Sequence, residues 1–144
     1  MIVNGYLMEI SRQKYNEEEI KRRYAMLYSL IDSVPDLIYY KDRKGIFLGC
    51  NISFGDFVGL SPYKVAGKTD YDLFPKQVAD IFRENDLKML SKMKPRLNEE
   101  LIEYPAGRKI LLETLTAPLV DADGKLLGIV CMSRDKTPEK ENAS

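Results

Sequence analysis

Four acidic side chains are the groups in this sequence that could carry out acid–base chemistry: Asp70, Asp72, Asp86 and Glu113. Such a mechanism needs two of them to converge on a cleft and to have shifted pKa values. Their places in the sequence instead predict helix caps and solvent-exposed faces. The chain also contains no histidine, the side chain that most often acts as a general base or activates a serine or cysteine nucleophile. We therefore expect no catalytic activity from this domain.

The sulfur-containing side chains offer little further chemistry. Cys50 and Cys131 lie far apart and lack the Cys-x-x-Cys spacing of a redox or metal site. Both fall in expected strands, where a free cysteine behaves as a small buried hydrophobic residue, and they indicate a reducing compartment. Met89 or Met93 could in principle ligate haem from a helix, but methionine there more often fills a core.

The composition is that of one globular domain with an additional segment. The 144 residues are 44% hydrophobic and 31% charged, which is enough for a core. Lysine plus arginine and aspartate plus glutamate both number 22, so no overall basic field attracts nucleic acid or an anionic membrane. The first residues lack the pattern of a signal peptide, and no apolar stretch approaches the roughly 20 residues of a membrane helix. We expect a cytoplasmic protein with no direct membrane contact and no nucleic-acid partner.

An amphipathic helix is predicted over residues 16–34, with residues 1–15 as a leader or arm. Asn16 is a suitable N-cap, and the acidic residues after it suit the positive end of the helix dipole. Apolar residues then recur at spacings of 4, 3, 4 and 3 until Pro35, which is typical of a heptad seam. Two interpretations remain open: a helix that packs on its own domain, and a linker that forms a dimer. The seam consists of Ile20, Tyr24, Leu27, Ile31 and Val34.

The middle of the chain predicts a β-hairpin followed by helices. Strands over residues 37–40 and 46–50 flank a loop that ends in glycine. Several short helical pieces come next, and a longer helix follows over residues 75–92, because proline fits the first helical turn. The apolar face of that helix consists of Val78, Phe82 and Met89, with Ala79 and Leu90 beside it.

The stretch GKTDYDLFP, residues 67–75, predicts a compact corner between these helices. Gly67 ends one short helix, and Thr69 or Asp70 caps the next. The apolar pair Leu-Phe within it is expected to point into the core.

The last part of the chain predicts three antiparallel strands. In the middle one of these, Leu112, Thr114 and Thr116 share one face. The last strand is apolar on both faces over residues 126–132, so both faces of the sheet need a cover. The short helices can cover one face, and the N-terminal helix or a second subunit is expected to cover the other. That outer face carries Leu111, Leu115, Val130 and Met132.

Two stretches of the sequence, in this order, resemble the PAS domain, a sensory domain of bacterial signalling proteins. They are NISFGDFVGLSPYKVAGKTDYDLFP and APLVDADGKLLGIVCMSRDKT. The second ends in Asp135-Lys136-Thr137, where the family's Asp-Ile-Thr signature has an apolar central residue. The resemblance covers residues 34–137 and leaves residues 138–144 as a tail. The positions that follow the family pattern are Asn51, Phe54, Gly59, Ser61, Gly67, Thr69, Asp70, Leu73, Phe74 and Pro75.

The resemblance implies an α+β fold: a five-stranded antiparallel sheet in the order 2-1-5-4-3, with short helices on one face and, in this chain, an N-terminal amphipathic helix. It implies a sensory and relay domain of a histidine kinase or diguanylate cyclase, which binds a small ligand between the sheet and the long helix. A ligand-free module that serves only dimerisation and relay is the alternative. A small α+β enzyme is a third reading, but its single long central helix disagrees with the broken helices before Pro75.

Known cofactors of the family restrict the ligand further. Haem-binding members use a histidine on the long helix, which this chain lacks, so haem held by histidine is excluded. Members with a covalent flavin photoswitch carry a reactive cysteine in the helical segment, where this chain has none, so we do not expect that chemistry. A small non-covalent ligand, of unknown identity, remains.

The expected pocket has an apolar wall with two hydroxyl groups. Thr114 and Thr116 are the polar candidates, since buried hydroxyls need partners. Threonine is also common in strands that bind no ligand, because its branched side chain suits a strand. Asn85 and Asp86 could close the pocket or face water. The predicted partners are a small molecule, an output domain, and a second copy that pairs through the N-terminal helix and the outer sheet face. The predicted lining residues are Tyr40, Cys50, Phe57, Val78, Phe82, Leu112, Thr114, Thr116 and Ile129.

Overall fold

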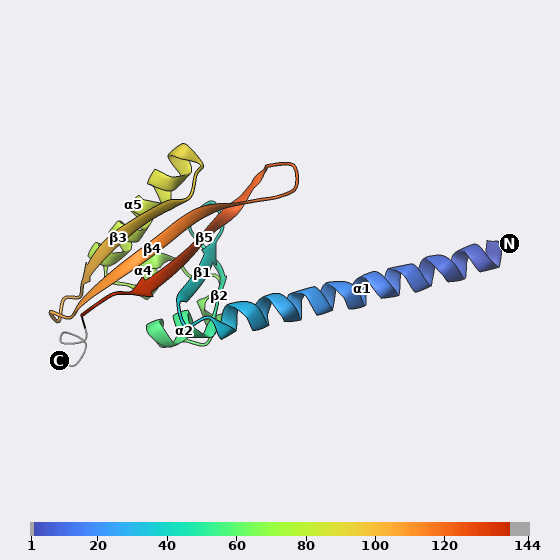
Figure 1. The fold of residues 1–144 in the computed structure, drawn as a ribbon, viewed down its shortest axis with the longest axis horizontal. Helices are drawn as coiled ribbons and strands as arrows, with labels where there is room; N and C mark the ends of the chain where they lie inside the picture. The colour runs from blue at the N-terminus through green and yellow to red at the C-terminus, as the bar shows by residue number, and fades with distance from the viewer. Residues whose placement is uncertain (1, 139–144) are drawn as a thin grey trace. The chain divides into compact units, whose positions relative to one another are not determined.

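The computed structural model describes residues 2–138, and it describes side chains from residue 16 onward. The chain divides into two compact units after Ser33. The first unit is a single helix, and the second contains all the strands (Figure 1). Most of the predicted tail, residues 139–144, lies outside the described residues.

The first unit is helix α1, Ile2–Ser33. The predicted start at Asn16 is wrong, because the helix already runs through residues 2–15. An asparagine inside a helix costs only a few tenths of a kcal/mol to about 0.7 kcal/mol, so its capping preference is easily overridden. The carboxylate of Glu19 pairs with Arg23 at 3.1 Å and with Arg22, which stabilises this part of the helix surface.

The second unit is an antiparallel sheet in the order β2-β1-β5-β4-β3, as the sequence predicts. Together with its helices this is the expected α+β fold. The β1–β2 hairpin packs through β1 against the last strand, β5. The strands are β1 Leu37–Lys41, β2 Phe47–Cys50, β3 Arg96–Glu103, β4 Lys109–Val120 and β5 Leu126–Asp135. The helices are α2 Ile52–Val58, α3 Pro62–Val65, α4 Asp70–Leu73 and α5 Lys76–Lys92.

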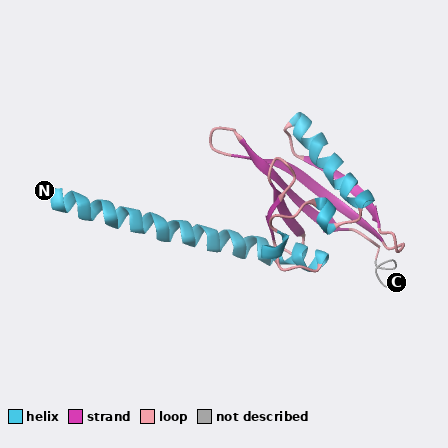
Figure 2. Ribbon diagram, turned by 180° about the vertical axis from the view of Figure 1, so that it is seen from behind, coloured by secondary structure: helices cyan, strands magenta, loops and turns pink. Residues whose placement is uncertain are grey.

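Helix α5 lies across one face of the sheet, which we call the inner face (Figure 2). The predicted apolar side of α5 is confirmed, since Val78, Ala79, Phe82 and Met89 are all buried. Along β4 the buried residues alternate with half-buried ones, so every second side chain enters the core. The core cluster also contains the stacked aromatic pair Tyr39 and Phe54, whose ring centroids are 4.4 Å apart.

The GKTDYDLFP corner is fixed to the hairpin by backbone hydrogen bonds. Gly67, at φ +89°, adopts a left-handed conformation that suits glycine. Its N–H donates to the carbonyl of Phe47 in β2, and the N–H of Phe47 donates to the carbonyl of Lys68, both at 2.8 Å. The carboxylate of Asp72 accepts from the backbone N–H of Thr69 at 2.9 Å, as expected of a capped helix start. The corner therefore holds α4 beside the sheet in a fixed orientation.

Asn51 joins three separate parts of the second unit. Its side-chain oxygen accepts from the backbone N–H of Ile38 at 3.1 Å and of Phe54 at 3.0 Å. Its side-chain nitrogen donates to the carbonyl of Asp36 at 2.8 Å and to that of Val34 at 3.3 Å. The residue is fully buried, so these bonds satisfy polar groups that have no access to water.

Candidate functional site

Eight of the nine predicted lining residues gather on the inner face, between the sheet and the helices. Five are members of the apolar core cluster: Cys50, Val78, Phe82, Leu112 and Ile129. Phe57 is partly buried and packs against that cluster. Thr114 and Thr116 are buried on the same side of β4 as Leu112.

The prediction for Tyr40 is wrong. Side chains alternate along a strand, and in β1 it is Tyr39 that belongs to the core cluster. Tyr40 is only half-buried and its hydroxyl lies directly over Gly49 of β2, where a Cβ atom would collide with it. The next residue, Lys41, again faces inward and is completely buried.

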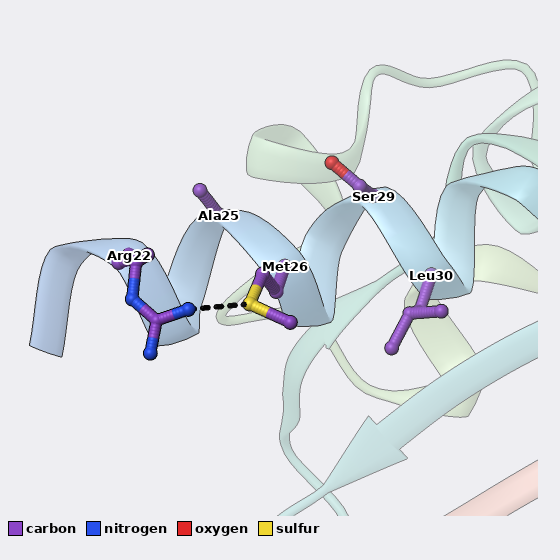
Figure 3. A pocket seen from close by; sticks show the side chains of 5 residues that line it. All are labelled: Arg22, Ala25, Met26, Ser29 and Leu30. Carbon is purple, nitrogen blue, oxygen red and sulfur yellow. Dashed lines mark hydrogen bonds between the residues drawn. The ribbon is translucent and has the colours of Figure 1, made fainter. Parts of the chain in front are cut away.

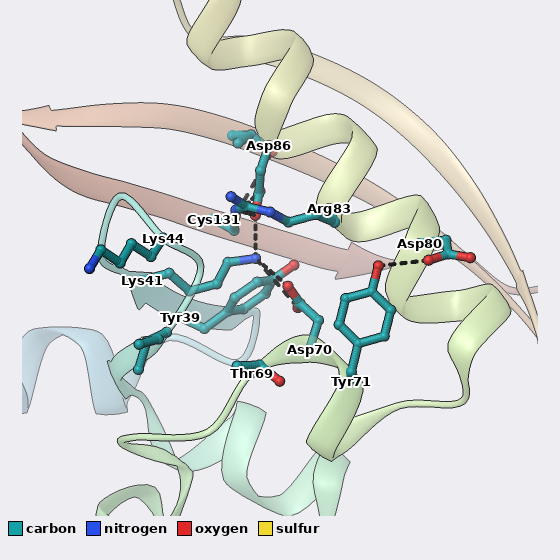
Figure 4. A network of polar contacts seen from close by, with 12 residues as sticks. Tyr39, Lys41, Lys44, Thr69, Asp70, Tyr71, Asp80, Arg83, Asp86 and Cys131 are labelled. Atoms are coloured by element: carbon teal, nitrogen blue, oxygen red, sulfur yellow. Dashed lines mark hydrogen bonds and ion pairs between the residues drawn. The ribbon is translucent and has the colours of Figure 1, made fainter.

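Lys41 is the centre of a buried ion cluster that the sequence analysis missed (Figure 4). Its ammonium group lies 3.1 Å from Oδ2 of Asp70 and 2.5 Å from Oδ2 of Asp86. Asp70 comes from the start of α4 and Asp86 from the middle of α5. The expectation that these two carboxylates face water is wrong, because both are at most 2% exposed. A lysine is almost never buried in this way unless it is paired.

The cluster is held in its charged form by its own members. Burial alone would lower the pKa of Lys41, but the carboxylates of Asp86 and Asp70 outweigh it and hold the pKa well above its ordinary value. Burial raises the pKa of Asp70, and the ammonium group opposes that rise. Arg83 adds a second positive charge from the edge, with Nη1 3.8 Å from Asp86.

Cys131 lies against this cluster as an inert thiol. Its Sγ is 3.8 Å from Oδ1 of Asp86 and 3.9 Å from the hydroxyl of Thr116. Burial raises the pKa of the thiol to about 12, so the reactive thiolate is not formed near neutral pH. This agrees with the interpretation of the cysteines as buried hydrophobic groups.

A row of hydroxyl groups crosses the inner face beside the ion cluster. The hydroxyl of Tyr39 on β1 lies 3.3 Å from that of Ser133 on β5, and Ser133 lies 2.8 Å from the hydroxyl of Thr114 on β4. All three side chains are buried. The row thus links three adjacent strands through side chains that satisfy one another.

The next strand along, β3, brings a carboxylate to the end of this row. Glu100 is 3% exposed, and burial raises its pKa to about 7. The hydroxyl of Thr114 and the amide of Asn85 lie near enough to favour the ionised form. Neither Thr114 nor Asn85 has the geometry of a hydrogen bond to Glu100. Within the described part of the chain, no residue donates to the two carboxylate oxygens of Glu100. The alternation of the sequence Asn-Glu-Glu-Leu-Ile-Glu, in which Glu100 shares a face with Ile102, is the signal that could have revealed it.

The other two acidic candidates lie outside this site. Asp72 is exposed and caps α4, as expected. Glu113 lies on the outer face and pairs with Lys136, whose ammonium group is 2.5 Å from Oε2. Within the described residues no group of three or more acidic, histidine or cysteine side chains is arranged to hold a metal ion.

Two cavities lie away from the inner face. One, of about 180 Å³, opens on the outer sheet face. The other is a shallow groove along α1 (Figure 3). The outer-face cavity is lined by Asp36, Leu97, Glu113, Leu115, Met132 and Arg134. The groove is lined by Arg22, Ala25, Met26, Ser29 and Leu30.

Comparison with known proteins agrees with this architecture. A family model described as the PAS fold matches residues 31–141. The aerobic respiration control sensor protein ArcB of Escherichia coli is 28% identical over 120 residues, which are 83% of this chain and 15% of ArcB. The methanogenesis regulatory histidine kinase FilI of Methanothrix harundinacea is 29% identical over 113 residues, which are 78% of this chain and 13% of FilI. The chain therefore spans only about a seventh of the length of these relatives.

A solved structure shows the same fold at lower sequence identity. It is VqmA of Vibrio cholerae in a complex with a ligand and DNA, with a TM-score of 0.69 and 23% identity over 78% of this chain and 51% of VqmA. At that identity the likeness concerns the fold alone. Among residues 2–138, no helix is both long enough and apolar enough to span a bilayer.

Proposed function

The chain belongs to the PAS family, and from that premise we propose that it is the sensory and relay domain of a signal-transduction protein of the histidine kinase type. The similarity to a sensor protein, ArcB, and to a histidine kinase, FilI, supports a kinase over a diguanylate cyclase as the output. Both relatives are several times longer than this chain, which supports an output domain elsewhere in the full protein. In this proposal the domain acts in the cytoplasm and has no catalytic activity of its own.

The proposed input is a small non-covalent ligand that enters between α5 and the inner sheet face. The observation that carries this proposal is the row of buried polar groups at that place: Tyr39, Ser133 and Thr114, with Glu100 beyond them. Ligand sites combine apolar walls with a few convergent polar groups, and the apolar wall is supplied by side chains such as Leu112 and Phe82.

The second candidate is a ligand-free relay module. It is favoured by the dense filling of the inner face, where Lys41 and a cluster of aromatic rings occupy the space between sheet and helices. Native mass spectrometry of the purified chain, combined with a thermal-shift screen of small molecules, separates the two. A retained or added compound that raises the melting temperature supports the sensor. A chain that carries no compound and responds to none supports the relay module.

We also propose a homodimer, formed through α1 and through the outer sheet face of each copy. The predicted seam on α1 is largely exposed, with Ile20 at 52%, Tyr24 at 57% and Leu27 at 57%. On the outer sheet face Leu97 is 65% and Leu101 is 56% exposed. Apolar surface of this extent favours a protein partner. No nucleic-acid partner is proposed, since the formal net charge is zero.

The dimer is tested by sedimentation velocity on the full chain. Leu27→Glu, alone and combined with Ile31→Glu, is expected to give a monomer, because a charge at the seam cannot be buried without a partner. Ser29→Glu adds the same charge on the opposite side of the helix and should leave the dimer intact. A wild type that is monomeric at high concentration, or a double variant that sediments as the wild type does, contradicts the proposal.

A further inference from the structure

Glu100 is a buried acceptor without a donor. Its carboxylate is enclosed by the protein, yet neither oxygen accepts a hydrogen bond from the residues that the structure describes. Buried polar groups in native proteins almost always have a partner, and an exception calls for a bound water, ion or ligand. The unpaired carboxylate is therefore the strongest sign of a binding group on the inner face.

The surroundings of Glu100 restrict what such a partner can be. Glu100 lies on β3 directly opposite Leu112 of β4, and α5 packs against both strands. The hydroxyl of Thr114 and the amide of Asn85 approach it without bonding to it. On the same strand face Ile102 is fully buried. A partner would meet the carboxylate at one end and apolar side chains along its body.

The charges on the inner face favour a cation. The inner face has three buried carboxylates: Asp70, Asp86 and Glu100. It has two positive groups, the ammonium of Lys41 and, at the edge, the guanidinium of Arg83. Lys41 is already engaged by both aspartates. When Glu100 is ionised, its negative charge is thus the one left without a counter-charge, and an anionic ligand would add to the imbalance.

We propose that Glu100 anchors a small organic cation that carries N–H donors, such as a primary ammonium or an amidinium group on an apolar body. This inference rests on the proposed ligand site between α5 and the inner face. The N–H groups would donate to the two carboxylate oxygens, and the apolar body would lie against Leu112 and Ile102. Charge-assisted hydrogen bonds of this kind are the strong ones in proteins.

The proton competes with such a ligand. Burial raises the pKa of Glu100 to about 7, so the carboxylate is ionised mainly above neutral pH. The charge of Asp86 adds to the cost of ionising Glu100, and that of Lys41 reduces it; the phenol of Tyr39, whose pKa burial raises well above its ordinary value, stays neutral. Binding of an amine that stays protonated throughout is therefore expected to strengthen as the pH rises from 6 to 8.

The test uses three fragments of similar shape and different charge: benzylamine, benzyl alcohol and benzoate. Each is titrated into the full wild-type chain at pH 8, and binding is followed by amide chemical shifts in β3 and β4. Benzylamine is expected to bind more tightly than the other two. Glu100→Gln should weaken benzylamine binding about tenfold or more. Glu99→Gln removes the same charge from the exposed neighbouring position and should bind as the wild type does.

Each other outcome overturns the inference in a distinguishable way. Two results would contradict the cation inference and leave the proposed ligand site supported. One is that benzoate or benzyl alcohol binds the inner face as tightly as benzylamine, and the other is that Glu100→Gln binds benzylamine as the wild type does. If none of the fragments and no compound of the wider screen binds, both the proposed ligand site and the cation inference are wrong. Thermal unfolding of both variants checks that they remain folded.

Discussion

Replacing Lys41 by methionine should destabilise the second unit strongly. The substitution keeps the unbranched shape and most of the length of the side chain and removes its ammonium group, so the loss of charge dominates the effect. It leaves Asp70 without its ammonium partner at 3.1 Å, and Asp86 retains only the more distant Arg83 at 3.8 Å. Two unit charges 3.1 Å apart attract one another by about 5 kcal/mol at an effective dielectric constant of 20. After desolvation is counted, the loss of one member of a buried ion pair costs about 3–5 kcal/mol.

The penalty should depend on pH in a defined direction. Burial already raises the pKa of Asp70 above its ordinary value of 3.8, and without Lys41 that rise is no longer opposed. A carboxyl group whose folded-state pKa is raised destabilises the protein fully above that pKa and not at all below its unfolded value. The cost of Lys41→Met is therefore expected to be largest at pH 7 and above, and to shrink as the pH falls toward 4.

Urea unfolding of the full chain measures both effects. The chain has 9 tyrosines and no tryptophan, so far-UV circular dichroism and tyrosine fluorescence are the suitable signals. Lys44→Met, in the exposed loop that follows β1, removes the same charge and should cost less than about 1 kcal/mol. The triple variant Lys41→Met, Asp70→Asn, Asp86→Asn should recover most of the loss, since neutral replacements of buried ion clusters are often tolerated. A single variant within about 1 kcal/mol of the wild type at pH 7, or a penalty that is equal at pH 4 and pH 7, refutes the reasoning.

Two further substitutions test the polar groups of the core. Asn51→Ala removes the acceptor of two backbone N–H groups and should lower the free energy of unfolding in urea by about 2–4 kcal/mol. The control is Ser61→Ala, at an N-cap without a side-chain hydrogen bond, which should cost less than about 1 kcal/mol. Equal losses for the two variants would show that the side-chain bonds of Asn51 contribute nothing. Glu100→Gln should stabilise the protein at pH 8, by up to about 3 kcal/mol for a pKa raised from 4.5 to about 7. It should have little effect near pH 4, where the wild-type carboxyl is mostly protonated in both the folded and the unfolded state. A gain that does not change between these pH values would mean that ionisation of Glu100 is not its cause.

The parts of the fold that follow from local patterns could be predicted from sequence. The strand order came with the family resemblance, and the apolar side of α5 and the capped corner at Thr69 came from spacing and capping residues. The start of α1 could not be placed, because Asn16 has the same capping side chain whether or not a helix continues past it. A start signal shows that a helix can begin there, and does not show that it must.

The ion cluster could not be predicted for a different reason. Lys41 precedes the sequence Asp-Arg-Lys-Gly and looks like the first residue of a solvated turn. Its partners lie 29 and 45 residues further along the chain, and each of them alone resembles a helix cap or a surface residue. The error at Tyr40 has the same origin. With two adjacent tyrosines the phase of β1 is ambiguous, and the burial of Lys41 decides it in favour of Tyr39.

The inner face is connected to the two ends of the domain through β5. Ser133, the centre of the hydroxyl row, lies opposite Leu37, the first residue of β1, and two residues before Asp135, the last residue of β5. Asn51 fixes the start of β1: its side chain accepts from the N–H of Ile38, the second residue of the strand, and donates to the carbonyl of Asp36, the residue before it. Because β1 and β5 are antiparallel neighbours, the first residue of β1 and the last residue of β5 lie at the same end of the sheet. The hydroxyl row therefore meets β5 close to the point where the second unit begins and where its last strand ends.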